Sequence, residues 1–153
     1  MEKPIPDGFV INEGRGPYSS HNGPYYINTS VNPWIHGTYI LERHCNAAQM
    51  AHGGMLMSFA DGILGHAVYK KTKRGGVTIK FNAEFLSAVR LGEWMEGYAV
   101  VNSVKDNFVY CEAILSVPTR RALSVTSIFK LRSSASQKKV IKNIQDIIKY
   151  QQP

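Results

Sequence analysis

The polar residues best able to do chemistry lie in one stretch, from His44 to Gly54, and are followed by Asp61. Apolar side chains surround Asp61 in sequence, and an unpaired charge buried among them would cost several kcal/mol. Such a carboxylate either faces water through a gap in the packing or lies beside a pocket where its charge is used. The second alternative makes Asp61 the leading candidate for a catalytic group.

Gly53 and Gly54 open the segment that contains Asp61. At the start of a helix, glycines allow a substrate to approach free backbone N–H groups, where the helix dipole favours developing negative charge. Such a helix start has the geometry of an oxyanion hole. His52 and Asp61 are nine residues apart, about 180° around a helix and about 13 Å along it. A site that uses both residues must therefore be shared between two chains.

Other catalytic chemistries lack their motifs. The five histidines show no HExxH or paired-cysteine spacing, so no metal site is expected. Cys45 follows His44, but adjacent strand residues point to opposite faces, which makes Cys45 a packing residue. No GxSxG, P-loop or dinucleotide fingerprint occurs. We therefore expect no cofactor.

The formal net charge of +7 is concentrated in two places. One is the C-terminal segment. The other is a basic cluster formed by Lys70, Lys71, Lys73 and Arg74. The cluster is either a solvated surface or a contact for an anionic ligand such as the phosphates of coenzyme A. No nucleic-acid-binding motif accompanies either segment, so nucleic acid is not an expected partner.

Hydrophobic patterning predicts the elements that position these residues. Short strands are expected over 25–29 and 34–42, and a helix apolar on almost every side, hence buried, from 53 to about 69. Four strands follow, over 77–86, 94–104, 108–117 and 122–131, with short joints that indicate antiparallel meandering hairpins. One helix wrapped by a single antiparallel sheet is an α+β arrangement.

The 153 residues fit a single domain, 1–153. Its core spans about 25–132, after an irregular N-terminal arm over 1–24 that is rich in Pro and Gly. Apolar residues at helical spacing predict a C-terminal amphipathic helix over about 136–152, which packs on the body or on a partner subunit. No signal peptide or membrane span is visible, and two cysteines make no disulfide framework, so a cytoplasmic location is expected.

The pattern Asn46, His52-Gly53-Gly54, Asp61 and then Gly76-Val-Thr78 resembles the acyl-CoA thioesterases of the phenylacetate-degradation type in the hotdog superfamily. The likeness covers about residues 25–132. It implies a hotdog fold and a dimer, often paired into a tetramer, with two shared sites. It also implies that Asp61 activates water or attacks the thioester, that the Gly53 N–H binds the carbonyl, that Asn46 and His52 position it, and that Thr78 assists Asp61. Family members often carry glycine at the position of Gln49.

The expected function is therefore hydrolysis of an acyl-CoA thioester by a homo-oligomer. Two rivals remain: a hydratase or dehydratase of acyl thioesters, and a non-catalytic acyl-CoA sensor. The sequence around His52 lacks the Pro-rich loop of the first rival, and the first 24 residues are too short for the DNA-binding segment of the second. Four aromatic residues are expected either in the acyl-pocket wall or in the core: Phe59, Tyr69, Phe81 and Phe85.

Overall fold

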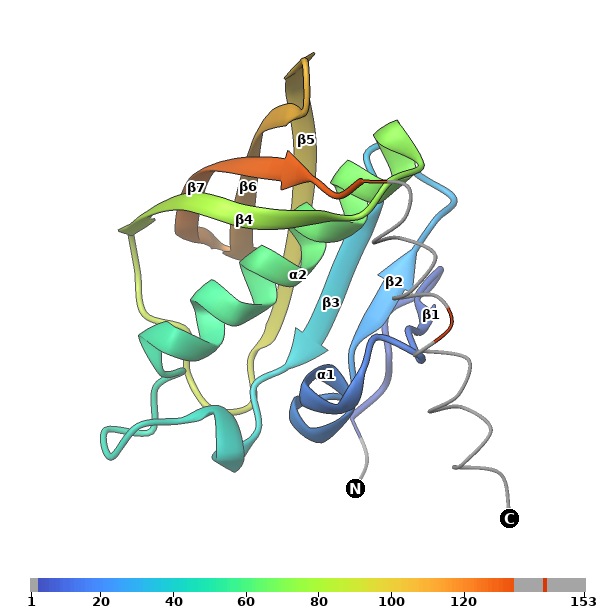
Figure 1. Cartoon of the computed structure of the whole chain (residues 1–153). Coiled ribbons are helices and arrows are strands. Elements are labelled where there is room, and N and C mark those ends of the chain that lie inside the picture. The colour runs from blue at the N-terminus through green and yellow to red at the C-terminus, as the bar shows by residue number, and fades with distance from the viewer. Residues whose placement is uncertain (1–2, 134–141, 143–153) are drawn as a thin grey trace.

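The structure is a computed structural model that describes residues 3–133 and residue 142. The helix predicted over 136–152 falls outside the described residues apart from that one position. One long helix lies across one face of a single antiparallel sheet (Figure 1). The α+β arrangement predicted from the sequence is confirmed.

The described residues form seven strands, two α-helices and a short 3₁₀ turn. In chain order they are β1 (Val10–Ile11), α1 (Pro17–Asn22), β2 (Tyr26–Asn28), β3 (Ile35–Tyr39), the 3₁₀ turn η1 (Glu42–His44), α2 (Gly53–Thr72), β4 (Gly76–Phe85), β5 (Trp94–Lys105), β6 (Phe108–Val117) and β7 (Arg120–Leu131).

The strand order in the sheet is β1-β2-β3-β5-β6-β7-β4. Strands β5, β6 and β7 form the expected meander, but β4 pairs with β7 and not with its sequence neighbour β5. The prediction of a hairpin between β4 and β5 is wrong because residues 86–93 cross to the middle of the sheet. Strand β4 is thereby left as an edge of the sheet, beside α2.

A bulge in β4 sets which of its side chains face the helix. Thr78 pairs with Phe129 and Lys80 pairs with Ile128, so Ile79 is an extra residue. Such an insertion shifts the in–out alternation of a strand by one position. Thr78 and Phe81 are consequently both half-buried on the helix side, although simple alternation would place them on opposite faces.

Helix α2 packs its large apolar residues on the sheet, and these form the core together with the inner faces of β5, β6 and β7: Met55, Leu56, Phe59, Ala60, Ile63, Leu64 and Val68. The opposite face is not covered by the sheet. Its residues are half-buried or exposed: Gly54, Met57, Ser58, Asp61, Gly62, Gly65 and Tyr69. The helix is therefore fully buried on its sheet side, and its opposite face, which carries Asp61, is half-buried or exposed in the single chain.

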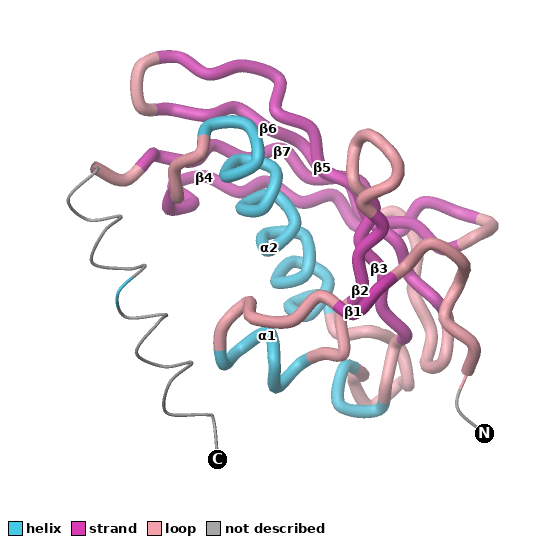
Figure 2. The backbone as a smooth tube through the Cα atoms, turned by 90° about the vertical axis from the view of Figure 1, so that its right-hand side faces the viewer, coloured by secondary structure: helices cyan, strands magenta, loops and turns pink. Residues whose placement is uncertain are grey.

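The N-terminal arm is more ordered than its Pro- and Gly-rich composition indicates. Strand β1 pairs with β2 and adds an edge to the sheet. Helix α1 lies beside α2 (Figure 2), where the Tyr18 hydroxyl donates to Ser58 Oγ at 3.0 Å and the Arg15 guanidinium donates to the Gly62 carbonyl. The arm thus contacts α2 at Ser58 and Gly62, which lie on either side of Asp61 in the sequence.

Among the described residues, no helix combines the length and the apolar content needed to cross a membrane.

Candidate functional site

The start of α2 leaves one backbone donor unused. His52 is the N-cap, and its Nδ1 accepts a hydrogen bond from the Gly54 N–H at 2.9 Å, while the Met55 N–H bonds the His52 carbonyl. The first N–H of a helix has no intrahelical acceptor. The Gly53 N–H has no partner in the described part of the chain. It is therefore available to an oxygen from outside.

The hydrogen bond from Gly54 also fixes the state of the His52 ring. A nitrogen that accepts a hydrogen bond carries no proton, so the neutral His52 ring holds its proton on Nε2. The His52 side chain is exposed. Its Nε2–H can donate outward while Nδ1 holds the helix start.

The loop before α2 is tied by Asn46. Its Oδ1 accepts from the N–H groups of Ala48 at 2.9 Å and Met50 at 3.3 Å, and its own N–H donates to the Met50 carbonyl. Gln49 adopts φ 56°, the left-handed conformation that glycine takes most easily. The turn therefore has the backbone that a glycine would favour, even though the residue is glutamine. The side-chain amide nitrogen of Asn46, Nδ2, takes part in none of these bonds.

Asp61 lies in the middle of α2 and is half-buried. Its Oδ1 accepts a hydrogen bond of 2.6 Å from Thr78 Oγ1, which the β4 bulge turns toward the helix. Its Oδ2 has no hydrogen-bond partner among the described residues. One carboxylate oxygen is thus held by the protein, and the other is available to a water molecule or a substrate.

The structure places Cys111 near this carboxylate, a neighbour that sequence reasoning missed. Cys111 is buried on β6, and burial, with the negative charge of Asp61 in addition, raises the pKa of its thiol to about 12. A thiol with that pKa stays protonated and unreactive at neutral pH. Only the pairing of β6 beside β7 and β4 brings it here, and no local pattern in the sequence marks it.

Phe85, at the end of β4, packs against the start of α2. A Cβ added at Gly53 would lie 3.1 Å from Phe85 Cε1 and 3.3 Å from Cζ, closer than ordinary van der Waals contact. The ring is 56% exposed. Gly53 is therefore required by this contact as well as by any substrate that approaches its N–H.

The other aromatic candidates are distributed differently. Phe59 is 2% exposed and stacks edge-on with Tyr25, so it belongs to the core. Phe81 packs partly buried against that core, and Tyr69 is exposed. Of the four, Phe85 lies closest to the start of α2.

His44 is a second residue whose importance the sequence did not reveal. It is buried, its Nδ1 accepts from the Leu41 N–H at 3.1 Å, and its Nε2 lies 2.6 Å from the Asn22 carbonyl. It thereby links the N-terminal arm to the loop that carries Asn46 and His52. Burial is the main cause that lowers the pKa of His44, which favours the neutral ring seen in this network.

The basic cluster is only partly available to a ligand. The Arg74 guanidinium donates to the Arg132 carbonyl at 2.7 Å and to Asn107 Oδ1 at 3.3 Å, so it holds the end of β7 to the loop after α2. Lys70 Nζ lies 3.9 Å from the centre of the Trp34 ring. Lys73 ends α2 in a left-handed conformation with φ 57°. Lys71 is exposed.

The predicted site residues form two groups. Asp61 and Thr78 are in contact, and Asn46, His52 and Gly53 lie together at the start of α2. Gly53 and Asp61 are eight residues apart on one helix, which is about 12 Å along its axis. Within one chain the carboxylate and the free N–H are thus separated. Among the described residues, no three His, Cys, Asp or Glu side chains cluster as metal ligands would.

Comparison with known proteins gives a consistent result. A family model described as "Thioesterase superfamily" matches residues 48–122, a range that includes His52, Gly53, Asp61 and Thr78. A Pseudomonas aeruginosa protein named "Putative esterase PA0474" is 27% identical over 130 residues, which are 83% of this chain and 97% of that protein.

Solved structures resemble the chain in fold. A Streptococcus pneumoniae protein, described as a "Hypothetical Thioesterase Protein with Coenzyme A", is 19% identical and superposes with a TM-score of 0.66 over 71% of this chain and 89% of that one. The PaaI protein of the E. coli phenylacetic acid degradation operon is 15% identical, with a TM-score of 0.59 over 63% of this chain and 74% of that one. The hotdog thioesterase fold predicted from the sequence is confirmed.

Proposed function

We propose that this chain belongs to the thioesterase superfamily and hydrolyses an acyl-CoA thioester to a free acid and coenzyme A, acting in the cytoplasm. The observation that carries the proposal is the 2.6 Å hydrogen bond that fixes one oxygen of Asp61 and leaves the other available. A carboxylate held in this way can serve hydrolysis without a cofactor. The relative described with coenzyme A supports the choice of substrate.

Hydrolysis needs an activated oxygen nucleophile and a donor for the oxygen that becomes negative. Asp61 Oδ2 either removes a proton from the attacking water or attacks the thioester carbon itself. The Gly53 N–H donates to the carbonyl oxygen as it gains charge, and the dipole of α2 reinforces it. His52, through Nε2, and Asn46, through its amide nitrogen, hold the thioester in place. Collapse of the tetrahedral intermediate expels the thiolate of coenzyme A, which takes up a proton. Attack by water gives the free acid directly, whereas attack by Asp61 leaves a mixed anhydride that a water molecule then hydrolyses to the free acid and Asp61.

The separation of Asp61 from Gly53 leads us to propose a shared site in a homodimer. Strand β4 is an unpaired edge, and apolar side chains on and just after it are exposed, among them Ile79 at 52% and Phe85 at 56%. Exposed apolar edges are rare in monomers because they pair with other chains. Pairing of β4 with the β4 of a second copy would bring Asp61 of one chain toward Gly53 of the other. Two such dimers can assemble into a tetramer.

Coenzyme A carries phosphates, and the basic cluster offers cations for them. Lys71, which is exposed, and Lys70, which lies over Trp34, are the side chains we propose for this contact, with Lys73 beside them. Arg74 contributes by holding the loop, since its guanidinium already bonds Arg132 and Asn107.

The decisive experiment combines a substrate panel with one substitution. Short, long and aromatic acyl-CoAs are incubated with the protein, and the released thiol is measured. Asp61→Asn keeps the side-chain shape but removes the charge, and should lower kcat by about 10²–10⁴ with little change in KM. Asp106→Asn, in the turn between β5 and β6, is the matched control and should keep native kcat.

Folding of both variants is first checked by circular dichroism and by size. Near-native turnover by folded Asp61→Asn would exclude Asp61 as the catalytic group. Tight binding of acyl-CoA without turnover by the native chain would favour the sensor over the enzyme.

A further inference from the structure

A second pocket lies on the side of α2 that faces away from Asp61. It has a volume of about 420 Å³ and lies between the second half of α2, strand β5 and the segment that leads into β3. Lys70 lines it and lies nine positions after Asp61 on α2, which turns the two side chains about 180° apart. The pocket therefore opens away from Asp61, although Lys70 and Lys71 are also the side chains proposed above for the phosphates of coenzyme A.

Two histidines line this pocket, and their rings have no hydrogen-bond partner among the described residues. His36, on β3, is only 4% exposed, and His66 lies on α2 with its ring centre 5.2 Å from that of His36. The Nδ1 atom of each ring is buried and unpaired within the described structure. A buried polar atom left unpaired is destabilising, and native proteins keep few of them. Two unpaired Nδ1 atoms in one pocket indicate that a bound ligand supplies their hydrogen-bond partners.

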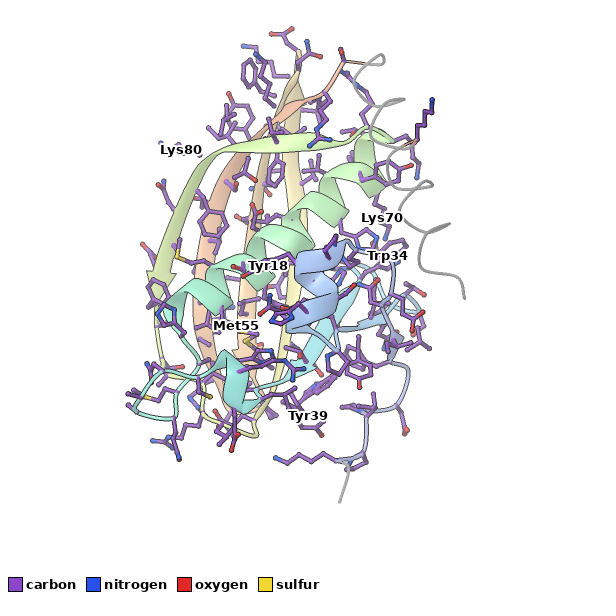
Figure 3. All side chains as sticks on the ribbon, turned by 60° about the horizontal axis from the view of Figure 1, so that its bottom comes forward. Tyr18, Trp34, Tyr39, Met55, Lys70 and Lys80 are labelled. Atoms are coloured by element: carbon purple, nitrogen blue, oxygen red, sulfur yellow. The ribbon has the colours of Figure 1, made fainter. Side chains whose placement is uncertain are left out.

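The charged groups around the pocket indicate whether that ligand is a cation or an anion. Lys70 and Lys71 line the pocket, and Lys70 Nζ lies over the ring of Trp34. Figure 3 labels Lys70 and Trp34 next to each other. The positive charge of Arg15 lies near enough to both rings to lower the pKa of His36 and of His66. No carboxylate belongs to the described residues that form the wall. A metal ion would meet two ammonium groups in the wall, with the charge of Arg15 nearby and no acid among the described lining residues to offset them, so an anion is favoured.

The protonation of the histidines agrees with this charge balance. Burial, followed by the charges of Arg15 and His66, lowers the pKa of His36 to about 3. Burial, followed by the charges of Arg15 and Lys70, also lowers the pKa of His66. Both rings are neutral when the pocket is empty, and each can donate one hydrogen bond to an anion and accept another.

The rest of the wall is apolar and is supplied by Ile63, Ala67, Ala99 and Val101. We propose that this pocket binds a small monocarboxylate with a compact apolar body. The carboxylate meets Lys70, Lys71 and His66, and the apolar body lies against Ile63 and Ala99. Apolar walls with a few convergent polar groups are the usual composition of small-molecule sites.

The test is a titration with benzoate, followed by calorimetry and by NMR of the histidine ring protons. We expect saturable binding that shifts the His36 and His66 signals. Lys70→Gln and His66→Leu should each weaken binding about tenfold, because each removes one charge-assisted or buried hydrogen bond. Lys130→Gln, which removes an exposed lysine on β7, is the matched control and should bind as the native chain does.

Two further ligands and one pH series sharpen the result. Benzamide, which has the same shape without the charge, should bind at least about tenfold more weakly than benzoate. Inorganic phosphate should compete poorly, because it lacks the apolar body. A bound carboxylate raises the pKa of neighbouring imidazoles, so benzoate should bind more tightly as the pH falls from about 8 to about 5.5, while Arg15, Lys70 and Lys71 stay charged.

Any of three results would overturn the proposal. The first is no benzoate binding up to about 10 mM, a limit that corresponds to less than about 3 kcal/mol of affinity. The second is binding that Lys70→Gln and His66→Leu leave unchanged. The third is binding that Asp61→Asn abolishes, because the acid would then occupy the other site.

Discussion

At the scale of single residues, the contact that matters most is the one between Thr78 and Asp61. The hydroxyl holds one carboxylate oxygen at 2.6 Å and thereby sets the direction of the other. A threonine can do this because the β4 bulge at Ile79 turns it toward the helix. In the proposed mechanism this hydrogen bond orients the carboxylate. Its contribution to activity can be tested by changing Thr78 and leaving Asp61 unaltered.

Thr78→Val keeps the shape of the side chain and removes the hydroxyl. We expect kcat to fall about 10–100-fold, since a hydrogen bond to a charged group contributes about 1.5–3 kcal/mol, while KM changes little. Thr78→Ser, which keeps the hydroxyl, is the matched control and should retain most of the activity. Steady-state kinetics on the best acyl-CoA of the panel measures both. Equal activity of the Val and Ser variants would mean that Thr78 only fills space.

The sequence allowed this residue pair to be predicted, but not its surroundings. Asp61 stood out as an acid among apolar residues, and the resemblance to the thioesterases pointed to Thr78. The neighbourhood of Cys111 and the position of Phe85 against Gly53 depend on strand pairing between distant segments. No local periodicity carries that information.

At the scale of elements, the loop from Asn46 to His52 shows how a fold tolerates an unfavourable residue. Gln49 takes φ 56°, a conformation that costs a residue with a Cβ about 1 kcal/mol. Five hydrogen bonds hold the turn in place. Two go to Asn46 Oδ1, and three are backbone bonds: from the Asn46 N–H to the Met50 carbonyl, from the Gln49 N–H to the Asn46 carbonyl, and from the Leu91 N–H to the Gln49 carbonyl. The loop therefore keeps, at Gln49, a backbone conformation that glycine favours, without a glycine.

Two substitutions at Gln49 separate backbone strain from side-chain chemistry. Gln49→Gly should change the free energy of unfolding by less than about 1 kcal/mol, because relief of strain offsets the greater freedom of the unfolded chain. Gln49→Val should lower that free energy by about 1–2 kcal/mol, since a β-branched residue fits a positive φ poorly. Urea unfolding measures both. Equal stability of the two variants would show that the turn can relax to another backbone.

The secondary-structure elements were predicted best where a hydrophobic pattern extends over many residues. The spans of α2 and of the four later strands agree with their sequence patterns to within a few residues. The pairing of β4 with β7 was missed, because the length of a joint does not reveal which strand it reaches. Strand β1 and helix α1 were missed because each is short and lies in a segment rich in Pro and Gly.

At the scale of the whole molecule, the arrangement of α2 requires a partner if the proposed mechanism holds. The free Gly53 N–H and Asp61 lie about 12 Å apart along one helix. Edge strand β4, with Ile79 and Phe85 exposed, is the surface we propose for the second copy. A monomer that is fully active, observed by light scattering at assay concentration, would contradict this arrangement.

Mixed dimers test the shared site directly. His52→Ala and Asp61→Asn chains, each inactive alone, should regain activity when unfolded together and refolded as a mixture. Each mixed dimer has one site with both native residues, and half of the dimers are mixed, so about a quarter of native kcat is expected. A mixture of His52→Ala chains that carry two different tags is the control and should stay inactive. Failure of the first mixture to recover activity, although mixed dimers are present, would place each site within one chain.

The position of two essential groups at opposite parts of one helix has a genetic consequence. In the proposed dimer, a chain that carries Asp61→Asn alone would spoil one of the two sites that it forms with a native chain and leave the other intact. A chain that carries both His52→Ala and Asp61→Asn spoils both sites, because it supplies one defective group to each. In a cell that makes both chains, the doubly changed one would act as a dominant-negative allele, and the singly changed one would only dilute the activity.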